Sequence, residues 1–265
     1  MTASRNLVEV ALNWVSASLP EDNTQRALWM DAATGAGNAT LRLAERLQGK
    51  GELVTVDVDP ESWTDWTRPK LEKAGLLDVV RFEELDLADL SNLRERFDGI
   101  FSDMTLSTMG LAAVEAVAEW RRVLKPGGCV IIRDYLPQGE ARNQDERITN
   151  LAWRLYKATE VLSGQPHYEE IPPEFWERRF TELGFRVEAL EVDPQRPPRS
   201  QESLDEWLSL PLEPDVDDAE LRDALIRVSE RLKDAVRTRR SMTRWSGDFI
   251  LLATWPRSSG GQAGG

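Results

Sequence analysis

The sequence contains one cysteine, one histidine and no long apolar run, and each scarcity excludes a class of protein. A single cysteine, Cys129, cannot form a disulfide within the chain, which favours a reducing compartment. One cysteine and one histidine, His167, cannot supply the ligands of a Cys/His zinc site. The sequence has neither an 18-residue apolar run nor a signal peptide, so we expect a cytoplasmic protein.

Basic residues are also few relative to acids. The chain has 33 Lys and Arg against 46 Asp and Glu, a formal net charge of −13. Because nucleic acids bind basic surfaces, this balance disfavours a nucleic-acid partner. The densest basic segment, residues 237–244, ends a predicted helix that opens with acids, a polarity that complements the helix dipole without any partner. We expect one domain over residues 1–256 and a disordered tail at 257–265.

The most informative segment is residues 27–38, ALWMDAATGAGN. An apolar run stops at Asp31, a turn containing Gly35 and Gly37 follows, and residues 39–47 are amphipathic, which predicts a strand, a glycine turn and a helix. Such a turn lets the backbone approach a nucleotide-like ligand, and the helix start offers unpaired N–H groups. A carboxylate at Asp31 would repel a pyrophosphate, but it suits an ammonium group beside a nucleoside, as in S-adenosylmethionine.

Four further segments continue the alternation of strands and helices. They are residues 52–57, which end at Asp57; 79–84, which lead to Asp86 and Leu87; 97–103, which end at Asp103; and 121–135, RRVLKPGGCVIIRDY. The order is that of an α/β fold with a doubly wound sheet. Asp57 follows the glycine turn by about 20 residues, where a ribose-binding carboxylate belongs.

These motifs resemble the class I S-adenosylmethionine-dependent methyltransferases. The match runs from Leu28 to Tyr135 and, more weakly, through residues 184–192 and 247–255. It implies a seven-stranded, mostly parallel sheet whose last strand is antiparallel, with helical inserts at about 136–183 and 198–244 over the acceptor side. One departure is Ala33, which stands where the family most often has its first glycine, although alanine is a common replacement there.

The resemblance implies S-adenosylmethionine as cofactor. Its binding residues would be Asp31, Ala33, Gly35, Gly37, Asp57, Val58, Asp86, Leu87 and Asp103. The alternative is a nicotinamide-binding fold, but that fingerprint requires a small residue where this chain has Thr40, and it has no counterpart of the turn at residues 125–128. The three acids that follow the first three strands could instead be helix caps or solvated strand ends.

The acceptor side is predicted from the later strand ends. In-line methyl transfer depends mostly on alignment, and an oxygen or carbon acceptor also needs a base. We consider Asp134, Tyr135 and His167 as catalytic candidates; the alternative for the histidine is an exposed loop position. The insert that carries His167, Tyr168 and Trp176 is expected to close over the pocket.

Two other features bear on this side. Asp103 and Asp134 end neighbouring strands, as in catechol-type O-methyltransferases, but Tyr135 replaces that family's amide ligand, so we expect no metal. An apolar stripe over residues 6–18 predicts a helix that either packs in the core or covers the cofactor as a lid.

The resemblance favours a methyltransferase that acts on a small molecule. The Asn-Pro-Pro-Tyr signature of enzymes that methylate planar amino groups is absent, because the fourth strand runs into residues 103–106, DMTL. Asn38 and residues 133–135 resemble the eukaryotic cytosine-3 tRNA methyltransferases, but the acidic balance disfavours tRNA. The main alternative is a protein of the same fold that binds S-adenosylmethionine without turnover, as a sensor or assembly partner.

Overall fold

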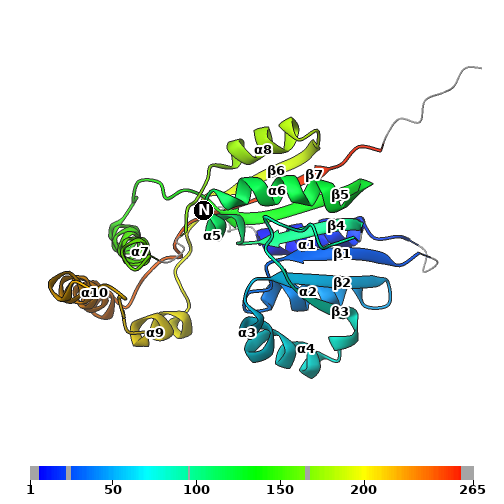
Figure 1. Ribbon diagram of the computed structural model, residues 1–265. Coiled ribbons are helices and arrows are strands. Elements are labelled where there is room, and N and C mark those ends of the chain that lie inside the picture. The colour runs from blue at the N-terminus through cyan, green and yellow to red at the C-terminus, as the bar shows by residue number, and fades with distance from the viewer. Residues whose placement is uncertain (1–5, 22–24, 95, 165–167, 258–265) are drawn as a thin grey trace, which may run out of the picture.

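A computed structural model describes residues 6–21, 25–94, 96–164 and 168–257. Its strands are β1 (Ala27–Ala32), β2 (Gly51–Asp57), β3 (Val80–Glu84), β4 (Phe97–Asp103), β5 (Leu124–Tyr135), β6 (Arg186–Asp193) and β7 (Asp248–Thr254). They form one sheet in the order β3-β2-β1-β4-β5-β7-β6 (Figure 1). Strands β1 to β5 pair in parallel, and β7 runs antiparallel to both β5 and β6. The predicted fold class, including the antiparallel closing pair, is confirmed.

Helices make up most of the rest of the described chain. They are α1 (Leu7–Ala17), α2 (Asn38–Leu47), α3 (Pro60–Ser62), α4 (Arg68–Ala74), α5 (Leu106–Met109), α6 (Ala112–Val123), α7 (Gln144–Leu162), α8 (Pro173–Glu182), α9 (Gln201–Ser209) and α10 (Ala219–Arg239), with a π-helical segment η1 (Trp63–Thr67) and a 3₁₀ turn η2 (Leu77–Val79). Helices α1, α2 and α4 pack on one face, and α6 and α8 pack on the other.

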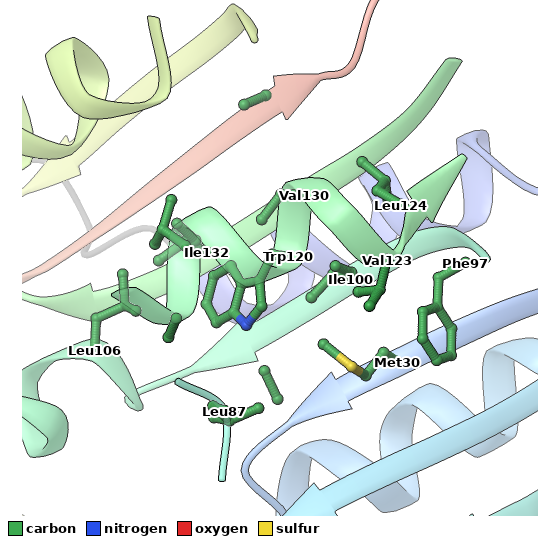
Figure 2. Close-up of a cluster of buried hydrophobic side chains, with 14 of the residues drawn as sticks. Met30, Leu87, Phe97, Ile100, Leu106, Trp120, Val123, Leu124, Val130 and Ile132 are labelled. Atoms are coloured by element: carbon green, nitrogen blue, oxygen red, sulfur yellow. The ribbon is translucent and has the colours of Figure 1, made fainter. Parts of the chain in front are cut away.

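The central strands are apolar on both sides because both of their faces are buried. On the face toward α6, Met30 and Ile132 lie around Trp120, which is fully buried (Figure 2). On the opposite face, Trp29 and Ile131 belong to the cluster formed with α1 and α2. Alternate residues of one strand therefore enter different cores, and the strand reads as a continuous apolar run.

Three helices stand apart from the sheet. Helices α7, α9 and α10, here called the cap, lie beyond the carboxyl ends of the parallel strands (Figure 1). They share a small apolar cluster of their own, which includes Ala152, Leu204 and Val236. The structure therefore places helices of both predicted inserts on this side of the sheet.

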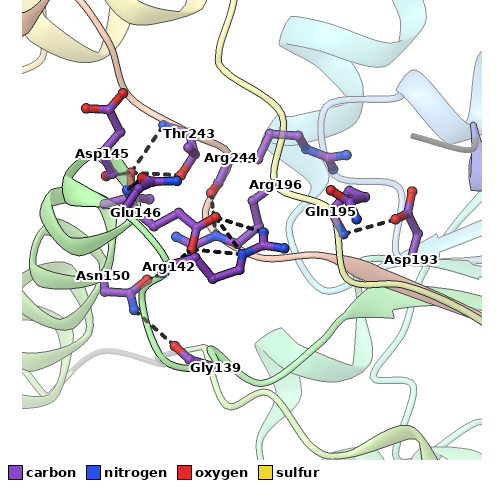
Figure 3. A network of polar contacts seen from close by, with 12 residues as sticks. Gly139, Arg142, Asp145, Glu146, Asn150, Asp193, Gln195, Arg196, Thr243 and Arg244 are labelled. Carbon is purple, nitrogen blue, oxygen red and sulfur yellow. Dashed lines mark hydrogen bonds and ion pairs between the residues drawn. The ribbon is translucent and has the colours of Figure 1, made fainter. Parts of the chain in front are cut away.

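A buried polar network joins the cap to the sheet (Figure 3). The Arg196 guanidinium donates from Nη1 to Asn150 Oδ1 of α7 at 2.7 Å and from Nε to the Arg244 carbonyl at 3.2 Å. Asn150 in turn donates to the Gly139 carbonyl at 3.1 Å. These contacts connect α7 to the segments that follow β5 and β6 and precede β7.

Some predicted details change in the structure. Helix α1 buries Leu7, Ala11 and Val15 against the sheet, so its stripe belongs to the core and α1 is not a lid. The prediction that Trp176 closes over the pocket is also wrong, because α8 packs on the sheet and buries this side chain in the core with α6. Helix α9 was not predicted, although Ser200 caps it by accepting from the Ser203 N–H.

Within the described ranges no helix is long and apolar enough to cross a membrane. The single-domain boundary at residue 256 stays a prediction, and residues 258–265 of the expected tail lie outside the described residues.

Candidate active site

The glycine turn follows β1 and adopts a left-handed backbone at three positions. Ala33, Gly35 and Gly37 have φ values of +74°, +46° and +75°. The positive φ of Ala33 explains why a glycine suits this position, since a left-handed conformation costs other residues about 1–2 kcal/mol. A Cβ atom placed on Gly37 would lie 2.4 Å from Thr67 Oγ1, whereas one on Gly35 would meet no atom within 4 Å. Gly37 therefore packs against η1, and Gly35 faces open space.

Asp31 ends its strand inside the protein, with no exposed surface. Its Oδ2 accepts hydrogen bonds from Thr40 Oγ1 at 2.6 Å and Thr55 Oγ1 at 3.1 Å. Its Oδ1 has no partner among the described residues. Burial raises the pKa of this carboxyl from 3.8 to about 7. A cationic ligand would pair with the free oxygen and favour the charged form of the carboxylate.

Thr40 has a specific role in this arrangement. It stands where a dinucleotide-binding turn has a small residue, and here its hydroxyl donates to Asp31. The same residue that disfavoured a nicotinamide fingerprint therefore holds the carboxylate that suits an ammonium group.

Asp57 closes the turn from the neighbouring strand. Its Oδ2 accepts from the Gly35 N–H at 2.9 Å, and its Oδ1 accepts from the Asp59 N–H at 3.1 Å. Val58 follows with 65% of its surface exposed. The structure thus brings the predicted ribose carboxylate into direct contact with the glycine turn, at the edge where a ligand would lie.

The third strand leads to the two predicted adenine-binding residues. Asp86 is exposed and accepts from the Ala88 N–H at 2.8 Å, while Leu87 is buried in the core. The Leu85 N–H donates to the Asp57 carbonyl at 3.1 Å, which holds this loop beside the end of β2. The assignment of both residues to adenine binding stays a prediction.

Side chains from η1 and α4 donate hydrogen bonds to the turn, and no pattern in the sequence predicted them. The Trp63 indole donates to Thr34 Oγ1 at 3.0 Å. Lys70 Nζ donates to the Ala36 carbonyl at 2.5 Å and to Asn38 Oδ1 at 2.8 Å. These contacts hold the turn against η1 and α4.

The ends of β4 and β5 carry acids that the protein itself engages. Asp103 pairs with Arg133 at 2.5 Å, and Arg133 also reaches Asp248 at 3.0 Å. Asp134 is buried and accepts from the backbone N–H groups of Ser107 at 3.0 Å and Tyr135 at 2.7 Å. Burial raises the pKa of Asp134 to about 6. Both carboxylate oxygens of Asp134 therefore accept hydrogen bonds from the backbone. The catalytic role of Asp134 stays a prediction.

Tyr135 opens onto a cavity of about 420 Å³ beneath the cap. Its aromatic lining residues are Tyr135, Trp153, Tyr156, Tyr168, Trp207 and Trp245. The Trp153 ring stacks on Trp245 at a centroid distance of 5.1 Å and lies 4.9 Å from Tyr168. Tyr135 and Tyr168, both expected on the acceptor side, lie 6.2 Å apart. This cavity has the size and composition of a small-molecule site.

The sequence indicated only part of this cavity. Trp153 of α7 is buried, whereas Leu151 and Leu162 of the same helix are each 46% exposed, so apolar residues alone do not mark the buried face of α7. Trp245 comes from the segment before β7, and its approach to α7 depends on the tertiary fold. His167 lies outside the described residues.

Comparison with known proteins finds a methyltransferase domain in part of the chain. Residues 30–128 match the family model described as a methyltransferase domain. The chain is 31% identical over 110 residues to the ubiquinone/menaquinone biosynthesis C-methyltransferase UbiE of Idiomarina loihiensis. The aligned region covers 40% of this chain and 41% of that protein. It is 26% identical over 170 residues to ltbC, a provisionally assigned methyltransferase of Aspergillus luteorubrus, covering 62% and 58% of the two chains. The chain therefore spans about two fifths to three fifths of the length of these relatives.

Solved structures show the same fold at lower identity. A Bacillus halodurans protein provisionally described as a methyltransferase superposes with a TM-score of 0.61 at 19% identity, covering 93% of this chain and 98% of its own. The [4+2]-cyclase SpnF gives 0.62 at 18%, covering 97% and 84%. Magnesium protoporphyrin IX methyltransferase of Synechocystis, solved with bound S-adenosylhomocysteine, gives 0.54 at 14%, covering 95% and 82%.

The strand order and the glycine turn define a Rossmann-like fold that binds its ligand at the carboxyl ends of the strands. Residues 30–128, which include the glycine turn, therefore match a methyltransferase domain, and the whole sheet has the strand order of the class I S-adenosylmethionine-dependent methyltransferase fold.

Proposed function

We propose that this protein transfers a methyl group from S-adenosylmethionine to a small-molecule acceptor. The observation that carries the proposal is an aromatic cavity of about 420 Å³ at the same end of the sheet as the glycine turn. The similarity to two proteins named as methyltransferases supports methyl transfer as the reaction. The volume lies within the range of roughly 300–1,000 Å³ for small-molecule sites.

The residues around the turn fit the proposed cofactor. Asp31 offers a buried carboxylate oxygen that has no partner in the described part of the chain. Gly35 leaves open space for a close approach, and Asp57 ends the adjacent strand. When bound, S-adenosylmethionine supplies a methyl group on a positively charged sulfur. The chain's own contribution is to bind and orient the two reactants, so that the acceptor atom approaches the methyl group in line.

Nucleic acid is a less suitable acceptor because three of the four arginines in the densest basic segment, residues 237–244, already form ion pairs. Arg237 pairs with Asp234 at 2.7 Å, and Arg239 pairs with Asp145 at 2.6 Å. Arg244 lies 3.1 Å from Asp248. These ion pairs occupy cations that phosphates would otherwise need, which supports a small molecule as the partner.

The two tyrosine hydroxyls at the cavity keep their protons at neutral pH. Burial raises the pKa of Tyr135 to about 12, and it also raises the pKa of Tyr168. Both phenols are therefore protonated at neutral pH and suit hydrogen-bond donation to an acceptor oxygen. We infer that they orient the acceptor and do not remove its proton.

The test is methyl transfer from methyl-labelled S-adenosylmethionine, with a fractionated metabolite pool and bulk tRNA supplied in separate reactions. The proposal predicts label in small molecules. Label in tRNA alone would contradict the substrate class. Binding of S-adenosylhomocysteine with no labelled product would instead favour the alternative of a non-catalytic binding protein.

A further inference from the structure

Two cationic side chains lie in the wall of the aromatic cavity. Arg199, between β6 and α9, donates from Nη1 to Ser203 Oγ at 3.0 Å. Its guanidinium lies 4.4 Å from the centroid of the Trp245 ring, and its Nε has no hydrogen-bond partner. Among the residues that the structure describes, no carboxylate lies within ion-pair distance of Arg199. The protein therefore holds this guanidinium in place without neutralising it.

Lys233 of α10 is the second cation. Its side chain is only 5% exposed, and its ammonium donates to the Leu210 carbonyl. Glu230 lies 3.5 Å away, but that side chain is half-exposed. An ammonium has three donors, so Lys233 can make a further contact inside the cavity.

The local charge differs from that of the whole protein. The chain has a net charge of −13, yet the cavity wall carries two cations against one carboxylate, Glu206, which is exposed. Burying charges is costly unless they are paired, so two partly desolvated cations in an aromatic cavity indicate an anionic ligand. Burial also lowers the pKa of Arg199, and the attraction of the exposed Glu206 does not offset this effect.

We propose that the acceptor is a planar aromatic carboxylate whose carboxylate group is bound by Arg199, with Lys233 as the second cation. The inference rests on the proposed function and specifies the substrate class of the same site. The planar guanidinium fork matches the geometry of a carboxylate, and the rings of Trp153 and Trp245 supply flat apolar walls. A neutral aromatic ligand would contact these rings but would leave the charges of Arg199 and Lys233 without an anionic partner from the ligand.

The test uses two probes of the same shape, 2-naphthoate and its neutral analogue 2-naphthamide, titrated calorimetrically into the full chain without cofactor. We expect naphthoate to bind at least about tenfold more tightly, as charge-assisted hydrogen bonds allow. Arg199→Gln should abolish this preference without changing naphthamide affinity. Arg199→Lys, which keeps the charge but loses the fork, should retain part of it. Arg227→Gln removes an exposed cation from α10 and serves as the matched control, with the preference unchanged.

Equal affinity for the two probes, no binding of either probe, or an unchanged preference in a folded Arg199→Gln protein would overturn the inference. Its failure is separable from that of the proposed function, because probe binding requires no methyl transfer. A charge preference without any labelled product would support the anion site and contradict the reaction. Labelled product without a charge preference would do the reverse.

Discussion

Replacing Asp31 by asparagine should make the ligand-free protein more stable at neutral pH. The wild-type carboxyl is fully buried, and its Oδ1 lacks a partner among the residues that the structure describes, so ionisation inside the fold is costly. An asparagine side chain has nearly the same shape and can still accept from Thr40 and Thr55. The substitution therefore removes the charge and leaves the local geometry in place.

The magnitude follows from the pKa of Asp31, which burial raises from 3.8 to about 7. A raised folded-state pKa means that the folded protein keeps a proton that the unfolded chain loses. The stability from this protonated group is fully present below about pH 4 and is lost as the pH rises to about 7. At 1.36 kcal/mol per pKa unit, the loss is roughly 4 kcal/mol at pH 8.

The assay is urea unfolding of the wild type and Asp31→Asn at pH 5, 6, 7 and 8, followed by circular dichroism. The stability difference in favour of the variant should grow across this range and level off above pH 7. Asp86→Asn, which removes an exposed carboxylate at the same edge of the sheet, is the matched control. A difference that stays constant from pH 5 to pH 8 would refute the reasoning. S-adenosylhomocysteine should bind wild type more tightly as the pH rises, and Asp31→Asn should weaken binding and remove that dependence.

Three further substitutions test other parts of the site. Asp57→Ala should weaken S-adenosylhomocysteine binding by about 1.5–3 kcal/mol, the range for hydrogen bonds to a charged group; wild-type affinity in a folded variant would show that the residue does not bind the ribose. Tyr135→Ala should lower methyl transfer about tenfold or more and leave S-adenosylhomocysteine affinity within about twofold; unchanged turnover would remove Tyr135 from the acceptor pocket. Gly37→Ala should lower the free energy of unfolding by about 2–4 kcal/mol, because its methyl group would clash with Thr67 in a left-handed turn. The added methyl group of Gly35→Ala meets no neighbour, so this variant should lose only about 1–2 kcal/mol of unfolding free energy, but it should impair S-adenosylhomocysteine binding. Thermal unfolding measures both stability losses, and a larger loss in Gly35→Ala than in Gly37→Ala would contradict this view of the turn.

The sheet could be predicted because its signals are local. Each parallel strand is an apolar run that ends at a polar residue, and a strand buried on both faces requires that pattern whatever its neighbours are. The glycine turn was recognisable because positive φ values restrict the residue type. The position of helix α1 could not be predicted, since an apolar stripe indicates that one face of a helix is buried but does not indicate which element covers it.

The acceptor side could be predicted only in part because its contacts join distant segments. The sequence placed Tyr135 and Tyr168 there, but Trp245 reaches Trp153 across more than 90 residues of chain. The position of Arg199 beside Trp245 likewise depends on how the chain returns from β6 to the cap. The pairing of Asp31 with Thr40 was equally hidden, because a threonine at a helix start gives no indication of its partner.

The most direct test of the central claim is calorimetric titration of the wild-type chain with S-adenosylhomocysteine and, separately, with NAD. A buried carboxylate before the glycine turn suits an ammonium group and repels a pyrophosphate. The account therefore predicts saturable binding of one S-adenosylhomocysteine per chain and no saturable binding of NAD. Saturable NAD binding without S-adenosylhomocysteine binding would contradict it.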